Sequence, residues 1–203
     1  MAELEFDVFD RDLLFKARKH DLLREAGRQF SKKGFHGTSM TDIAKGIKLT
    51  KSGLFHYVKT KEELLYLCYE DAIISAEQCM NSALEVDGSA LDKISHYIRH
   101  HLGHFDQRGG YYVILSELSV LSEDNQKKLH KRAKNVDQKM FELVESGIKE
   151  GSIASINPKM ALYAIEGALN WVPKWYSHSG GENINKIAED FITFFTNGLK
   201  TRD

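Results

Sequence analysis

Apolar residues recur at helical spacing through most of the chain, and only two prolines interrupt the pattern. In residues 13–33, Leu, Ala and Phe side chains recur at this spacing and Gly34 follows, which predicts a helix that ends there. A short apolar stretch at residues 111–121 predicts one more helix. Longer stripes predict helices over residues 60–84, 89–106, 123–150, 158–177 and 182–200. We therefore expect an all-α protein of about nine helices.

Capping residues predict two short helices after the first long one. Ser39 stands three residues before Asp42, the spacing of a capping box at a helix start, and Thr60 begins the next long helix in the same way. Between them, Thr50 can cap a short helix that extends to Tyr57. Two short helices joined by a tight turn are the sequence form of a helix-turn-helix.

The packing of this motif follows from its apolar positions. Ile43 and Ala44 in the first short helix, with Leu49 and Leu54 after it, are the residues expected to hold the pair together. Gly53 lowers helix stability by about 1 kcal/mol relative to alanine. Either a close approach of the backbone to a partner or crowding between the helices explains this glycine.

Charge is unevenly distributed, although the formal net charge is only -1. Residues 13–61 carry twelve Lys or Arg against three acidic residues, whereas residues 1–12 and 62–203 are both acidic overall. A basic segment of this kind is typical of a head that binds a polyanion, and a merely solvated basic face is the alternative.

Several classes of protein are excluded by missing motifs. The sequence contains no phosphate-binding loop, nucleophile elbow, His-Glu-x-x-His or Cys-x-x-Cys, so we expect neither an enzyme nor a cofactor. It also has no apolar run of roughly 18 residues and no signal peptide, which favours a cytoplasmic protein without a membrane partner. A helical small-molecule-binding protein or enzyme without a DNA site is the alternative function.

Three runs of residues carry a specific resemblance: 37–44 (GTSMTDIA), 50–58 (TKSGLFHYV) and 61–65 (KEELL). Over roughly residues 15–70 the sequence resembles the N-terminal domain of the TetR family of transcriptional regulators. The resemblance implies a dimeric, all-helical repressor whose third helix enters the major groove of a palindromic operator. Its C-terminal helices would bind a small-molecule effector and form the homodimer.

This resemblance divides the chain into three parts and assigns DNA contacts. The expected parts are an acidic N-terminal tail (1–12), a helix-turn-helix domain (13–60) and an effector-binding and dimerisation domain (61–203). Lys51 would meet the groove floor or flanking phosphates, and Tyr57 and Lys61 would grip phosphates. The candidate DNA-binding residues are Ser39, Thr41, Thr50, Lys51, Ser52, Gly53, Phe55, His56, Tyr57 and Lys61.

Two residues depart from the family pattern. Phe55 stands where the family usually has tyrosine, so a hydroxyl contact to DNA is missing. Lys48 stands where the family favours glycine. A positive φ at Lys48 would be strained by about 1 kcal/mol, and a slightly different turn is the alternative.

The two C-terminal helices have apolar faces wider than one packing seam needs, in residues 158–176 and 184–199. Such faces can bury one side internally and the other against a second copy of the chain. Pro173 predicts a kink or an early end of the first of them. The candidate effector-pocket residues are Tyr111, Tyr112, Asn170, Trp171, Trp175 and Tyr176, with core and interface packing as the alternative.

A narrower resemblance concerns the effector. Residues 167–171 (GALNW), Trp175-Tyr176 and the apolar pattern of 187–199 resemble the TetR subgroup that responds to acyl-CoA thioesters. The resemblance implies an acyl-CoA effector, with its acyl part in an apolar tunnel and its phosphates near basic side chains. The available cations are Arg99, Arg108, Lys127 and Lys128.

Three histidines one helical turn apart suggest one further site. His96, His100 and His104 have a spacing at which imidazoles can bind a transition metal. The apolar residues of that helix lie on roughly the opposite side, and no Cys or carboxylate completes the set. We therefore expect a solvated or pocket-edge face and no metal.

Overall fold

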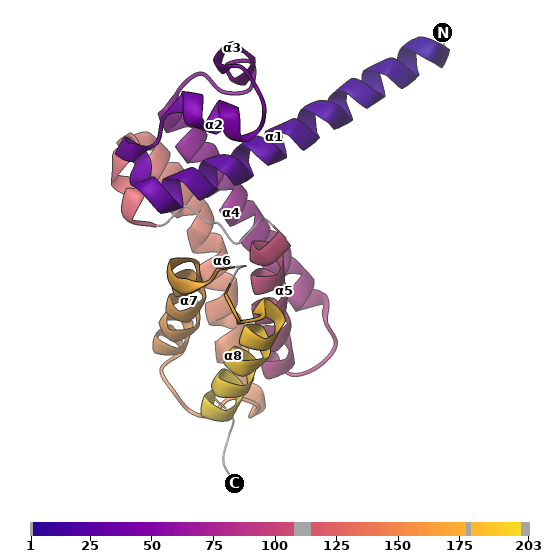
Figure 1. The fold of residues 1–203 in the computed structure, drawn as a ribbon. Coiled ribbons are helices and arrows are strands. Elements are labelled where there is room, and N and C mark those ends of the chain that lie inside the picture. Colours follow the sequence, from indigo (N-terminus) through magenta and orange to yellow (C-terminus); the bar gives the residue numbers. More distant parts are fainter. Residues whose placement is uncertain (1, 108–114, 178–179, 200–203) are drawn as a thin grey trace. The chain divides into compact units, whose positions relative to one another are not determined.

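The computed structural model describes residues 2–107, 115–177 and 180–199, and the elements within these ranges are helices (Figure 1). In chain order they are α1 (Ala2–Gly37), α2 (Met40–Gly46), α3 (Lys51–Leu54), α4 (Lys61–Glu85), α5 (Ala90–Gln107), η1 (Leu115–Val120), α6 (Glu123–Glu150), α7 (Pro158–Trp175) and α8 (Ile184–Leu199). The prediction of an all-α fold is confirmed. None of the helices described here is long and apolar enough to cross a membrane.

The chain forms two compact units. Residues 1–71 and 111–122 make the first unit, and residues 72–110 and 123–203 make the second. The helix α4 contributes residues to both. Compared with the predicted boundary at residue 60, the first unit also contains the beginning of α4 and the 3-10 helix η1.

In the first unit, α1 is longer than the predicted helix over residues 13–33. Helical geometry breaks at Gly34, with φ 70° and ψ 170°, so the predicted stop is a kink followed by one more turn. Leu22 and Ala26 are fully buried, whereas Leu13 and Leu14, which were predicted to lie on the same apolar face, are exposed. Helical spacing predicts a helix, but it does not show where the neighbours of that helix begin.

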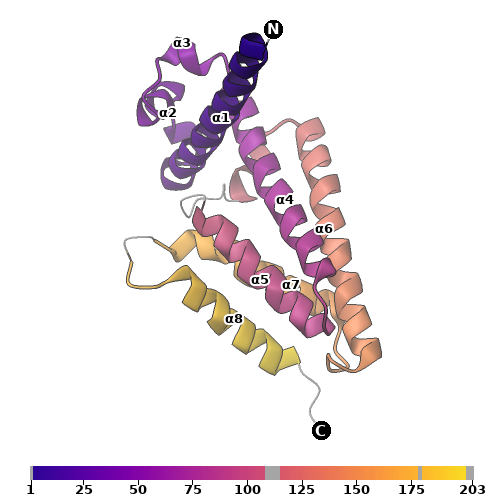
Figure 2. The same cartoon turned by 90° about the vertical axis from the view of Figure 1, so that its right-hand side faces the viewer.

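The second unit is a layered bundle of helices. The helix α5 packs against α8 and α6, and α6 packs against α7 (Figure 2). Arg99 on α5 makes a bidentate ion pair with Glu189 on α8, with Nε and Oε1 2.6 Å apart. The largest fully buried side chains of the second unit are Met80, Ile94, Tyr97, Ile98, Leu102 and Phe105.

Side chains also cap two helices of the second unit. The Asp92 carboxylate accepts hydrogen bonds from the backbone N–H and hydroxyl of Ser89, at 2.8 and 2.7 Å, at the start of α5. The Asn157 side chain accepts from two backbone N–H groups at the start of α7. This helix ends at Trp175, two residues after Pro173, as the proline predicted.

Candidate functional site

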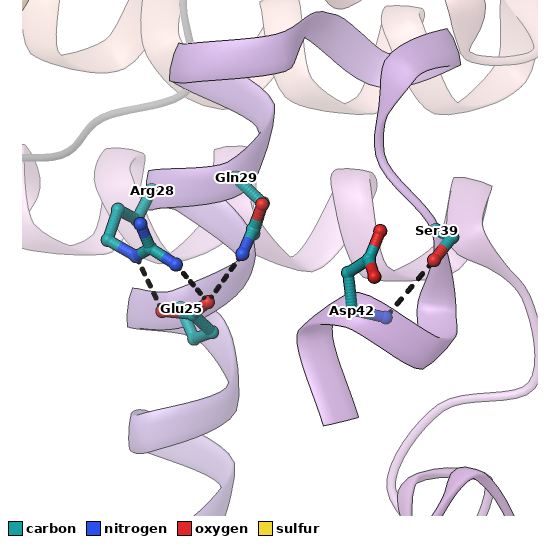
Figure 3. A network of polar contacts seen from close by, with 5 residues as sticks. All are labelled: Glu25, Arg28, Gln29, Ser39 and Asp42. Carbon is teal, nitrogen blue, oxygen red and sulfur yellow. Dashed lines mark hydrogen bonds and ion pairs between the residues drawn. The ribbon is translucent and has the colours of Figure 1, made fainter. Parts of the chain in front are cut away.

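The α2 helix begins with the cap that the sequence predicts. The hydroxyl of Ser39 accepts a hydrogen bond from the backbone N–H of Asp42, at 3.1 Å, and so satisfies a donor in the first turn (Figure 3). Ile43 and Ala44, on the other side of the helix, are buried. The remaining side chains of α2, including Thr41, are at least partly exposed.

The turn between α2 and α3 is a Schellman motif with a lysine in the glycine position. The Leu49 N–H donates to the Ala44 carbonyl at 2.8 Å, and the Lys48 N–H donates to the Lys45 carbonyl at 3.1 Å. Lys48 has φ 56°. Of the two alternatives for this residue, the structure shows the positive φ, so the turn keeps its shape and the lysine side chain is strained.

The α3 helix is one turn long and is fixed mainly by its ends. The Thr50 hydroxyl accepts from the Gly53 N–H at 3.0 Å and lies 3.1 Å from the Ser52 hydroxyl. Leu54 is fully buried against the rest of the motif. The helix ends at Leu54, short of the predicted Tyr57, and backbone hydrogen bonds of turn type continue to Val58.

The glycine in α3 is only mildly crowded. A Cβ at Gly53 would lie 3.2 Å from the Thr50 hydroxyl and 4.0 Å from the nearest atoms of Leu49. A side chain at this position would therefore make the capping hydroxyl of Thr50 shift by a few tenths of an ångström, so crowding inside the motif stays one reason for this glycine. A close approach of its backbone to DNA stays a prediction.

The candidate DNA-binding residues form an outer surface of this motif. Lys51 carries no ion pair or hydrogen bond within the part of the chain that the structure describes. Gly53, Phe55 and Tyr57 are half-buried at its edge. The exposed members of the candidate set are Ser39, Thr41, Thr50, Lys51, Ser52 and His56.

Lys61 lies differently from the other candidates. Its ammonium donates to the carbonyl oxygens of Phe35 and Thr38, at 2.7 and 2.8 Å, and stands 4.3 Å from the centre of the Phe35 ring. The side chain thus fastens the start of α4 to the end of α1. The predicted phosphate contact would have to use the third N–H of this ammonium or displace one of the two carbonyls.

A polar network in α1 lies against the end of α2. The Glu25 carboxylate accepts from the Arg28 guanidinium and, at 2.8 Å, from the Gln29 amide (Figure 3). Burial alone would raise the pKa of Glu25, but these hydrogen bonds and the charge of Arg28 hold it below its ordinary value. A Cβ at Gly46 would lie 2.5 Å from Glu25 Cδ, so only glycine lets α2 approach this network.

Comparison with protein families matches both parts of the chain. The family described as "Bacterial regulatory proteins, tetR family" matches residues 22–66, and "Tetracyclin repressor-like, C-terminal domain" matches residues 87–199. The chain belongs to the TetR family. It is therefore a DNA-binding transcription regulator, and the helix-turn-helix lies in the N-terminal match.

Other TetR-family proteins cover nearly the whole chain. The HTH-type transcriptional repressor KstR2 of Mycolicibacterium smegmatis is 21% identical over 186 residues, which are 90% of this chain and 91% of that protein. The structure of the ketosteroid transcriptional regulator KstR2 of Mycobacterium tuberculosis matches with a TM-score of 0.81 and 16% identity, over 91% and 96% of the two chains. AibR in complex with isovaleryl coenzyme A and operator DNA matches with 0.72 and 23%, over 87% and 97%. At these identities the two structures establish the TetR fold.

The candidate effector residues of this TetR-family chain are not gathered in one place. Trp171 and Trp175 lie on the outer face of α7, with 62% and 47% of their surfaces exposed. Tyr176 is half-buried, and its hydroxyl donates to Asp106 at 2.8 Å. Asn170 is exposed, and its amide reaches the Glu166 carboxylate at 3.5 Å. Tyr111 and Tyr112 lie outside the described residues.

A carboxyl group lies inside the second unit, where the sequence analysis named no site. Glu166 on α7 accepts from the Tyr97 hydroxyl on α5 at 3.4 Å. Burial raises the pKa of Glu166 to about 7, and the negative charge of Asp137 on α6 adds to the effect. In the sequence, the only signal for this position is that a single Glu stands among apolar residues.

Two of the three histidines join α5 to α4. His96 Nε2 lies 3.0 Å from the Ser82 hydroxyl, and His104 Nδ1 lies 3.2 Å from the Ser75 hydroxyl. His100 is exposed and stacks on His96 with 4.0 Å between ring centres. Among the described residues, no three His, Cys, Asp or Glu side chains could hold a metal ion together.

The sequence analysis did not single out Phe15, Gly46 or Glu25. Phe15 is an aromatic residue beside the apolar face of α1, and its ring stacks on Tyr57. The glycine at the end of the first short helix, Gly46, could have indicated the close approach to Glu25. Helix ends commonly carry glycine for other reasons, so this signal is not specific.

Proposed function

We propose that this chain is a repressor that binds a palindromic DNA operator as a homodimer and is released by a small-molecule effector. The observation that carries the proposal is the helix-turn-helix of the first unit, with an ordered cap at each short helix. Its second helix buries Leu54 and leaves Lys51 and Ser52 exposed to a groove, and His56 in the turn that follows is exposed as well.

Support for a homodimer comes from the outer faces of α7 and α8. Trp171 is 62% exposed and Phe194 is 73% exposed, and Tyr163 and Met160 continue the stripe on α7. Soluble proteins rarely leave such large apolar side chains grouped on adjacent turns unless a partner covers them. The opposite sides of both helices are buried in the second unit, so each helix has the two apolar faces that the sequence predicts.

Two glycines strengthen the same point. A Cβ at Gly167 on α7 or at Gly198 on α8 would meet nothing within 4 Å. Glycine lowers helix stability by about 1 kcal/mol at such positions, and no contact within the chain requires it. Gly198 also lines an open groove with Phe194 and Asn197. A helix of a second copy that approaches closely supplies the missing reason.

We infer further that the effector is an acyl-CoA thioester. The sequence resembles the acyl-CoA-responsive subgroup in α7 and α8, and the similar protein AibR forms a complex with isovaleryl coenzyme A. Of the cations available for its phosphates, Arg99 is held by Glu189, and Arg108 lies outside the described residues. Lys128 is exposed, and Lys127 makes only a surface pair with Glu123.

Release requires that the effector bind one conformation more tightly than the other. We propose that the conformation favoured by the effector moves α4 and misplaces the two helix-turn-helix motifs of the dimer for the operator. A typical coupling of 1–3 kcal/mol lowers the affinity for DNA about 5- to 150-fold.

The first experiment selects an operator from a random-sequence duplex pool with the purified protein. A palindromic sequence, bound by wild type and lost in Lys51→Ala, is the expected result. Failure to enrich any sequence contradicts operator binding. Light scattering after size exclusion is expected to give twice 23.2 kDa. Trp171→Asp is expected to give the monomer, whereas Leu84→Asp, at another exposed apolar residue, leaves the dimer intact.

The effector is tested by a thermal-shift panel of coenzyme A, short and long acyl-CoAs and free fatty acids. A thioester at 100 times its dissociation constant stabilises the folded protein by about 2.7 kcal/mol. The same compound is then added to the operator complex, where a fall in DNA affinity is expected. Stabilisation by a free acid as strong as by its thioester contradicts the acyl-CoA proposal.

A further inference from the structure

An aromatic pair joins the beginning of α1 to the end of the helix-turn-helix. The rings of Phe15 and Tyr57 stack with 4.8 Å between their centres and 21° between their planes. Phe15 precedes the buried face of α1, which begins at Leu22, and 46% of its surface is exposed. The ring of Phe15 thus packs on a residue next to the helix-turn-helix and not in the core.

The stacking contact uses the ring of Tyr57 and leaves its hydroxyl able to bind another group. Its backbone N–H donates to the Leu54 carbonyl at 2.9 Å, and the next residue, Val58, is buried, so the main chain here is fixed. The Tyr57 hydroxyl makes no hydrogen bond within the described residues. A phenol that is held by its ring and free at its hydroxyl is a preorganised donor to a phosphate oxygen.

Two cations lie one helical turn further along α1. Arg18 and Lys19 stand three and four residues after Phe15, so they share its side of the helix. Neither makes an ion pair within the described part of the chain, where Asp21 pairs with Arg24 and Glu25 with Arg28. Phe15, Arg18 and Lys19 lie on the same helix, α1. The stack therefore links the position of the Tyr57 hydroxyl to the positions of these two positive charges.

We propose that Phe15 is a positioning residue for DNA binding. By stacking on Tyr57 it fixes the phenol for a backbone phosphate and holds Arg18 and Lys19 near the same strand, so the beginning of α1 extends the contact surface beyond the helix-turn-helix. The inference rests on the proposed operator binding. The ligand is the phosphodiester backbone of duplex DNA, and no base is read at this position.

The test measures fluorescence anisotropy of the selected operator duplex with wild type, Phe15→Ala, Phe15→Leu and Phe15→Tyr. Loss of the ring in Phe15→Ala or Phe15→Leu is expected to weaken binding about three- to tenfold. Phe15→Tyr keeps a stacking ring and is expected to bind like wild type. Leu14→Ala is the matched control, because Leu14 is a similarly exposed neighbour, 59% exposed.

A double-mutant cycle with Tyr57→Ala separates positioning from a general effect on folding. Tyr57→Ala is expected to weaken binding less in the Phe15→Ala background than in wild type. The log–log salt slope of Phe15→Ala is expected to fall by about one to two, since Arg18 and Lys19 lose phosphates. Additive effects, an unchanged slope, or equal losses in Phe15→Ala and Leu14→Ala overturn the proposal.

The two levels of inference fail in different ways. If wild type enriches no duplex, or if Lys51→Ala binds as wild type does, operator binding through α3 is wrong. If wild type and Lys51→Ala behave as expected while Phe15→Leu binds like wild type, only the role of the Phe15 ring is wrong. Thermal unfolding followed by circular dichroism shows that each variant compared is folded.

Discussion

The Lys61 ammonium lies 2.7 Å from the carbonyl oxygen of Phe35, on the far side of the helix-turn-helix in sequence. It also donates to Thr38 and faces the Phe35 ring, so one charge satisfies two carbonyls at the end of α1. Hydrogen bonds to charged groups are stronger than those between neutral groups. This contact joins α1 to α4 within the first unit.

Replacing Lys61 by methionine is expected to destabilise the chain by about 2 kcal/mol, because two carbonyls lose a charged donor while the aliphatic stem is kept. Urea unfolding followed by circular dichroism measures the change. Lys59→Met is the control. The Lys59 ammonium is exposed and makes only a 3.5 Å contact with the carbonyl oxygen of Phe55. Equal stability of the two variants contradicts the role of Lys61 in joining α1 to α4.

The same pair of variants tests the phosphate contact predicted for Lys61. A lysine that neutralises a phosphate contributes about one unit to the log–log salt slope of DNA binding. Because the Lys61 ammonium is already engaged by carbonyls, we expect the slope of Lys61→Met to equal that of wild type. A slope lower by one means that Lys61 neutralises a phosphate when DNA binds, through its third N–H or by displacing a carbonyl.

Lys48→Gly is expected to stabilise the protein by about 0.5–1 kcal/mol, because glycine adopts φ 56° without strain. The gain is smaller than the strain itself, since glycine also makes the unfolded chain more flexible. Lys45→Gly removes the same charge inside α2 and is expected to destabilise by about 1 kcal/mol. Thermal midpoints of the three proteins give the comparison, and a loss of stability in Lys48→Gly contradicts the strained turn.

Most of the fold was predictable because helical periods and caps are local. The starts of α2, α3 and α4 each follow a Ser or Thr that the sequence analysis identified, and α6 has the predicted bounds. The beginning of α1 was not predictable in the same way. Leu13 and Leu14 have core spacing but are exposed, because burial depends on neighbours that are distant in sequence.

Gly46→Ala is expected to weaken both stability and DNA binding, because the new Cβ meets the Glu25 carboxylate that Arg28 and Gln29 hold in place. The cost is about 1–3 kcal/mol, in the range of overpacked cores. In a Glu25→Ala background the same substitution has room, and alanine then favours the helix. Urea unfolding of the four proteins forms a double-mutant cycle, and purely additive changes contradict the clash.

Glu166 is expected to make stability fall as the pH rises. Its pKa is raised from 4.5 to about 7, so between these values the folded protein holds a proton that the unfolded chain releases. Glu166→Gln removes this dependence and is expected to exceed wild type above pH 7 by about 3 kcal/mol. The two proteins converge below pH 4.5. Unfolding at several pH values measures this, with exposed Glu85→Gln as the control.

The helix-turn-helix was easier to predict than the contacts inside the second unit, and the reason is physical. The residues of the helix-turn-helix lie within about twenty positions of one another and obey local caps and turns, so spacing alone places Lys51 on its outer face. The second unit is held together by contacts between helices that are distant in sequence. The cluster of Tyr97 and Glu166 joins α5 to α7 across 69 positions, which no local pattern records.

Both tryptophans of the chain, Trp171 and Trp175, lie on the outer face of α7. The tryptophan fluorescence of the protein therefore comes from that one surface, and none of it originates in α2 or α3. In the homodimer proposed above, this face is covered, and we expect dilution to shift the emission to longer wavelength because water then surrounds the indole rings. Under that proposal the wild-type chain carries its own optical reporter of assembly, and no label has to be attached.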